Sequence, residues 1–188
     1  MMRKCGSWWV CNFWKLKNVN QTLPANDKEL LQQIFNLLKV RVTANPYKQN
    51  GEFARQICEL PIGLRAMAAT HHLDISLTLD DIGWHFLNFG EEKHISETEN
   101  GLRELGLEEI AQLFAEAYKI VFPLLPQIRA GKNADYYICL EKAGQMDRIN
   151  ELTDKASELL KQGGNSSIYP FWTKYARQHP EQVFDGSD

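Results

Sequence analysis

The chain has 188 residues, which is long enough for one domain with a real core and too short for two full domains. Its 44% hydrophobic and 24% charged residues are ordinary for a soluble globular protein. The formal net charge is only −3, and the lysines of the mildly basic front are spread out, so direct binding to nucleic acid has little support.

Residues 1–25 are predicted to form a tryptophan-rich arm ahead of the domain. The apolar run from Ser7 to Trp14 is roughly half of the ~20 residues that a membrane span needs, and it lacks the cleavage site of a signal peptide. Three interpretations stay open. The run is an arm or strand that covers the core, a contact with a membrane interface or partner, or the product of a start codon placed too early.

The cysteines predict a reducing compartment. Cys5, Cys11, Cys58 and Cys139 form no CxxC pair, so zinc ribbons and thioredoxin-type motifs are absent from the sequence. Without a signal peptide, these thiols indicate a cytoplasmic protein.

The first half of the domain is predicted to be helical. Asn26 is a suitable N-cap for the first helix, which Asn45-Pro46 terminates. Helices are also expected at 53–58, from Pro61 to about His72, and from Thr78 to a stop at Gly90. Residues 73–77 alternate in polarity and are expected to form a short strand or a linker.

The second half is predicted to be helical as well. A capping box at Ser96 and Glu99 predicts a helix that ends at Gly106, and 108–125 gives the clearest amphipathic pattern. Asp135 is expected to cap a long helix that Gly144 interrupts and that Gly163-Gly164 stops. A short helix from Pro170 to about His179 ends a single domain, 26–180, before a tail, 181–188. The prediction is an all-α bundle of six to eight helices.

Negative charge is concentrated in the middle of the sequence. Residues 73–118 hold eleven acids and two bases, a local charge of −9. Nine of these acids are predicted to form a binding face for a basic protein: Asp80, Asp81, Glu91, Glu92, Glu97, Glu99, Glu108, Glu109 and Glu116. An ordinary solvated face is the alternative, but such faces tend to mix signs because opposite charges four residues apart attract. Carboxylates about 6–8 Å apart along helices also resemble the closely spaced charges of duplex DNA.

Catalytic motifs are scarce in this sequence. Asp81 and His85, four residues apart on an expected helix, could share a metal ion or a proton, with Asp80 beside them. This trio is the basis of an alternative hypothesis, a metal-dependent hydrolase. HExxH, GxSxG, Walker and GxGxxG patterns do not occur, so we predict neither an enzyme nor a cofactor.

The segment around Gly83 indicates close packing. A glycine inside a helix costs about 1 kcal/mol relative to alanine, which suggests that another helix approaches there. The neighbouring Trp84, Phe86 and Phe89 are expected to be core residues, with binding anchors as the alternative.

One family has a similar pattern. The stretch 79–88, Leu-Asp-Asp-Ile-Gly-Trp-His-Phe-Leu-Asn, followed by Gly-Leu-Arg-Glu-Leu-Gly at 101–106, resembles the bacterial DNA-mimic protein family over about residues 57–121. The matching positions are Gly83, Trp84, His85, Asn88, Leu102, Arg103 and Gly106. The family has phenylalanine and glutamine where this chain has Trp84 and His85, and an Asn-Gly pair where it has Asp81 and Ile82.

The resemblance implies a small helical protein without established enzyme activity. In at least one member of that family, an acidic dimer occupies the DNA site of a transcription factor. The matched residues are expected to have structural roles, and the acids to provide the mimicry. Relatives also look like immunity proteins, so an antitoxin-like protein that neutralises a toxin is a further alternative. Arg103 is expected either to pair with Glu99 at the helix junction or to contact a partner.

Overall fold

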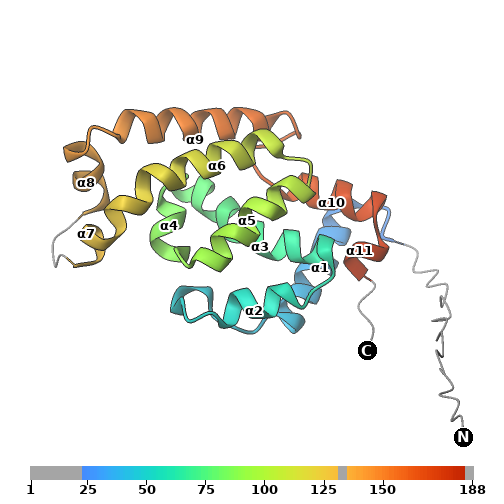
Figure 1. The fold of residues 1–188 in the computed structure, drawn as a ribbon. Coiled ribbons are helices and arrows are strands. Elements are labelled where there is room, and N and C mark those ends of the chain that lie inside the picture. The colour runs from blue at the N-terminus through green and yellow to red at the C-terminus, as the bar shows by residue number, and fades with distance from the viewer. Residues whose placement is uncertain (1–22, 131–134, 185–188) are drawn as a thin grey trace, which may run out of the picture.

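The computed structural model describes residues 23–130 and 135–184, and every regular element in these ranges is a helix (Figure 1). The elements are α1 (Asp27–Arg41), η1 (Pro46–Lys48), α2 (Glu52–Cys58), α3 (Ile62–Leu79), α4 (Trp84–Phe89), α5 (Glu92–Glu104), α6 (Glu108–Val121), η2 (Phe122–Leu124), α7 (Leu125–Ala130), α8 (Tyr136–Lys142), α9 (Met146–Lys161), α10 (Tyr169–Gln178) and α11 (Glu181–Phe184). The all-α fold class is confirmed. Residues 1–22 of the expected arm lie outside the described residues.

The described ranges hold eleven α-helices, more than the six to eight expected. The additional helices are short: α7 and α8 have six and seven residues, and α11 has four. The 3₁₀ turn η2, which contains Pro123, separates α7 from α6, and Gly144, at φ +65°, separates α8 from α9. Apolar spacing alone does not show where a longer helix divides in this way.

Helix α3 runs through the middle of the fold and packs against α1, α2, α4, α5, α10 and α11 (Figure 1). It continues through residues 73–77, so the expectation of a strand or linker there was wrong. Because α3 is buried on most sides, it lacks the polar stripe by which an amphipathic helix is recognised. Its buried hydroxyls are satisfied within the helix, since Thr70 and Ser76 donate to the carbonyl oxygens of Ala66 and His72.

The next helix boundary also differs from the expectation. Thr78 does not begin a helix but lies in the last turn of α3, where its hydroxyl donates to the Asp74 carbonyl at 2.8 Å. The chain turns at Asp81–Gly83, and α4 begins at Trp84. A threonine hydroxyl can bond a carbonyl four residues back as readily as it caps a helix, so its presence did not locate the boundary.

Most other terminators act as expected. Asn26 and Asp135 accept hydrogen bonds from the amides of Lys28 and Tyr137 and cap α1 and α8. Gly106, at φ +76°, ends α5. Helix α5 nevertheless begins at Glu92, before the capping box expected at Ser96.

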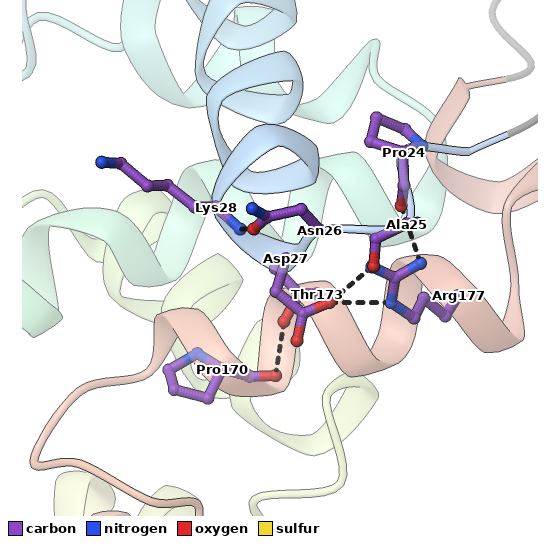
Figure 2. Close-up of polar contacts among 8 residues, drawn as sticks. All are labelled: Pro24, Ala25, Asn26, Asp27, Lys28, Pro170, Thr173 and Arg177. Atoms are coloured by element: carbon purple, nitrogen blue, oxygen red, sulfur yellow. Dashed lines mark hydrogen bonds and ion pairs between the residues drawn. The ribbon is translucent and has the colours of Figure 1, made fainter.

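Helix α10 fixes the first described residues against the bundle (Figure 2). Arg177 donates to the carbonyl oxygen of Pro24 at 3.0 Å and to that of Ala25 at 2.9 Å. Its guanidinium also pairs with the Asp27 carboxylate at 2.5 Å. Three acceptors thus converge on one side chain, which places the beginning of α1 beside α10. In the described residues, no helix is long and apolar enough to cross a membrane.

We expect Arg177→Ala to lower the free energy of unfolding by about 1 kcal/mol or less, because the contacts are multiple but exposed. Arg177→Lys should restore only part of this, since an ammonium group cannot make the forked contacts of a guanidinium. Urea unfolding of the three proteins is the measurement. Equal stability of the lysine variant and the wild type would contradict the role of the fork.

Candidate functional site

The predicted acids fall mainly on α5 and α6, two neighbouring helices joined by a tight turn (Figure 1). In this turn the Leu107 amide donates to the Leu102 carbonyl at 2.8 Å, and the Gly106 amide donates to the Arg103 carbonyl at 2.9 Å. This pair of hydrogen bonds is a Schellman motif, which requires the left-handed conformation that glycine adopts without strain. The motif fixes the end of α5 next to the beginning of α6.

Five of the nine acids are exposed or half-exposed on these two helices. On α5, Glu92 and Glu99 are seven residues apart and share a stripe. On α6, Glu109 and Glu116 are also seven residues apart and share a stripe, and Glu108 lies beside Glu109 at the beginning of the helix. We call Glu92, Glu99, Glu108, Glu109 and Glu116 the α5–α6 acidic surface.

Arg103 holds the two stripes together at the helix junction. Its guanidinium lies 2.7 Å from a Glu99 oxygen and 3.3 Å from a Glu108 oxygen. The predicted pairing with Glu99 is therefore confirmed, and a second carboxylate joins it. These contacts fix the positions of both carboxylates and partly neutralise them.

Arg148 of α9 pairs with the surface from outside the acidic segment. It lies 2.5 Å from Glu116 on α6 and 2.5 Å from Glu151 on its own helix. Arg148 lies 32 positions after Glu116 in the sequence, so a count of charges within residues 73–118 does not include it. The acids of this surface are thus less isolated than the −9 segment indicated.

Two of the nine predicted acids are buried and belong to the interior. A carboxylate oxygen of Asp81 accepts hydrogen bonds from the Trp84 amide at 2.8 Å and the Tyr136 hydroxyl at 2.9 Å. Burial raises the pKa of Asp81, although both hydrogen bonds oppose this. Glu97 pairs with Lys93 at 2.9 Å, and the Cys58 thiol donates to it at 3.4 Å. Neither carboxylate is available to a docking protein.

The remaining two acids lie away from this surface. Glu91 is half-buried and accepts a hydrogen bond from the Gly51 amide at 3.2 Å, so it links the beginning of α5 to the beginning of α2. Asp80 is exposed at the end of α3, where Tyr137 of α8 bonds to it. This bond and burial together raise the pKa of Tyr137, with burial the larger cause.

The trio of the alternative hydrolase hypothesis does not converge. Asp81 faces Tyr136 and the beginning of α4, whereas His85 is fully buried among aromatic rings and Asp80 is exposed. His85 contacts Phe86, Phe89 and Phe114 at ring-centroid distances of 5.7, 5.2 and 5.3 Å. Residues 23–130 and 135–184 contain no group of three His, Cys, Asp or Glu side chains arranged to hold a metal ion.

The motif residues maintain the helix junctions. Gly83 packs where a β-carbon would overlap the Tyr136 hydroxyl and lie 3.0 Å from the Val121 side chain, so the expected close approach is found. Asn88 donates its side-chain amide to the Trp84 carbonyl at 3.1 Å. Leu102, Phe86 and Phe89 are fully buried, while Trp84 is half-buried.

A groove lies beside the acids at the beginning of α6. It has a volume of about 330 Å³ and is lined by Glu108, Glu109, Leu107, Ile110, Leu159 and Phe171 among others. The α5–α6 turn and the helices α6, α9 and α10 contribute these residues, which lie far apart in sequence. Amphipathic spacing gave no signal for the groove, because Leu159 and Phe171 follow the pattern of ordinary core residues.

We expect Gly83→Ala to lower the free energy of unfolding by about 1–3 kcal/mol, the usual effect of overpacking a filled site. The added methyl group would displace the Tyr136 hydroxyl from buried Asp81. In Gly83→Ala/Tyr136→Phe the two losses should be less than additive, since the phenylalanine removes the overlapping oxygen. Urea unfolding measures this coupling, and strictly additive losses would contradict it.

Comparison with protein families places these helices in a known group. The family model described as DMP19-like protein matches residues 58–179, which extends from the end of α2 to the end of α10. Comparisons with curated proteins and with solved structures gave no match. The matched region contains the helix junctions and the acidic surface described above. It covers more than half of the chain, and the protein belongs to the DMP19-like family, a family of DNA-mimic proteins.

Proposed function

We propose that this protein is a non-enzymatic binding module that docks a basic, DNA-binding protein on its α5–α6 acidic surface. The observation that carries the proposal is the position of five carboxylates on two packed helices inside the region that matches a DNA-mimic family. The family supports the class of partner, and the geometry supports the location of the contact.

Three of the five carboxylates are held in place by ion pairs. Glu99, Glu108 and Glu116 are held by Arg103 or Arg148. A partner therefore meets part of the charge pattern already in place, and less side-chain entropy is lost on docking. Glu92 and Glu109 make no ion pair with any described residue, so their charges remain available to attract a base.

The groove beside Glu108 and Glu109 adds an apolar component. Phe171 and Leu159 line it next to the two carboxylates. Charged contacts mainly accelerate and orient association, whereas anchors buried in pockets contribute much of the affinity. A basic partner with one apolar side chain near its contact surface fits both parts of this site.

The first test reverses charge on the surface. Glu92, Glu108 and Glu109 all lie in the first turns of their helices, and the triple Glu→Lys variant should lose the partner. The matched control reverses Glu29, Glu52 and Glu181, which lie in the first turns of α1, α2 and α11. Both variants change the net charge equally and place lysine at equivalent helix positions.

The measurement is capture of basic proteins from a bacterial lysate, identification by mass spectrometry, and titration of a purified captured protein. We expect the wild type and the control variant to bind it more weakly at high salt, because exposed charges are screened within about 10 Å at 0.1 M salt. Duplex DNA should compete with the binding. Equal affinity of the surface variant and the control variant would refute the proposed location.

A second prediction concerns Arg148. Arg148→Ala removes the base that neutralises Glu116 and Glu151. At low salt the partner should therefore bind this variant more tightly than it binds the wild-type protein, and at high salt the two affinities should differ little. Calorimetric titration of the purified partner at both salt concentrations is the measurement. Weaker binding by Arg148→Ala would mean that ordering of Glu116 matters more than its charge.

A further inference from the structure

Three histidines from three helices meet in the core. They are His72 of α3, His85 of α4 and His94 of α5, with 8%, 0% and 1% of their surface exposed. The centroid of the Phe89 ring lies 4.5, 5.2 and 5.9 Å from the ring centroids of these histidines. His94 lies 5.7 Å from His72 and 5.8 Å from His85, again between ring centroids. One phenylalanine therefore contacts all three rings.

Four ring nitrogens of this cluster make no hydrogen bond with the described residues. They are Nδ1 of His72, both nitrogens of His85, and Nε2 of His94. A buried polar group without a partner is unfavourable, and a buried charge without a partner is far more so. The cluster is compatible with the closed core only while its rings are neutral.

The surrounding elements offer little to balance a charge. Phe53 of α2 lies 5.2 Å from His72 and 4.7 Å from His94, between ring centroids. Phe114 of α6 contacts His85, and Tyr47 of η1 contacts Phe89. Among charged groups, Glu97 of α5 acts on His94, while Asp74 of α3 acts on His71, which itself adjoins His72. Glu97 is already paired with Lys93 and bonded by the Cys58 thiol.

Burial therefore dominates the pKa of each ring. It lowers the pKa of His72 to about 3 and that of His94 to about 4, and it holds the pKa of His85 well below the ordinary value. The backbone carbonyls of His72 and Ala69 favour the charged forms of His85 and His94, but less than burial disfavours them.

We propose that the His72–His85–His94 cluster is an acid-sensitive switch at the junction of α3, α4 and α5. At neutral pH the uncharged rings close the core around Phe89. As the pH falls below about 6.5, the opened and hydrated form binds protons that the closed form excludes, so the equilibrium shifts toward an open junction. The opening includes the beginning of α5, where Glu92 lies. The switch does not require a docking partner and holds whether or not the proposed function is correct.

The direction of the effect follows from proton linkage. An unfolded histidine titrates near pH 6.5, and the folded rings titrate well below that value. The stabilisation by the neutral rings is complete above about pH 6.5 and is lost as pH falls toward the folded pKa values. Each histidine reduces the folding equilibrium constant about tenfold per pH unit in this window, and three together approach a thousandfold. Ordinary carboxylates titrate near pH 4, so the loss between pH 6.5 and 5 distinguishes histidines.

The test is urea unfolding of the full chain, followed by circular dichroism, at several pH values between 7.5 and 5. The slope of the logarithm of the unfolding constant against pH gives the protons taken up. We expect about three from the cluster, to which His71 adds because burial lowers its pKa as well. His85→Gln, His72→Gln and His94→Gln should each reduce the slope by about one. His179→Gln, which lies outside the cluster, is the control for replacing a histidine with glutamine.

The slope remains informative even if a variant is less stable at every pH, and three separate variants guard against one that fails to fold.

Hydrogen–deuterium exchange locates the opening: after correction for intrinsic rates, amides of α4 and the first turn of α5 should gain more exchange at pH 5.5 than those of α9. A wild-type slope near zero, or a slope unchanged in all three cluster variants, would overturn the proposal. Equal gains across the described helices would overturn the local opening.

Discussion

The enclosure of α3 by six other helices is the constraint on which the rest of the structure depends. An enclosed helix must satisfy its polar groups without water. Thr70, Ser76 and Thr78 do so by donating to carbonyls one turn back, and Asp74 accepts from the Ser167 hydroxyl and the Ile168 amide. The last two contacts attach the beginning of α10 to α3, and they connect residues more than ninety positions apart.

The same enclosure determines how closely α5 approaches. Gly101 packs where a β-carbon would lie 3.0 Å from the Ala66 carbonyl oxygen and 3.1 Å from its Cα. The backbones of α3 and α5 are therefore near each other, and one face of α5 is buried. The other face carries Glu92 and Glu99 to the surface next to α6. Packing in the core thus determines which acids are available to a partner.

The histidine cluster shows a different consequence of this burial. His85 is fully buried and makes no hydrogen bond with the described residues. A neutral imidazole fills an aromatic site well but leaves its nitrogens unsatisfied. The site that completes the core at neutral pH is therefore sensitive to acid, and the sensitivity arises from packing rather than from any exposed charge.

The sequence by itself determined the helical class, the close approach at Gly83, the terminators Gly106 and Gly144, and the family. These depend on local chemistry: a left-handed turn requires glycine, a cap requires a short polar side chain, and the motif spans neighbouring residues. Tertiary structure decided the rest. The packing of the helices buries Asp81 and Glu97 and separates the Asp80, Asp81 and His85 side chains. It also pairs Glu116 with Arg148 and places three histidine rings in contact with Phe89. Spacing along a helix indicates which residues share a side, but burial and ion pairing depend on which distant helix covers that side.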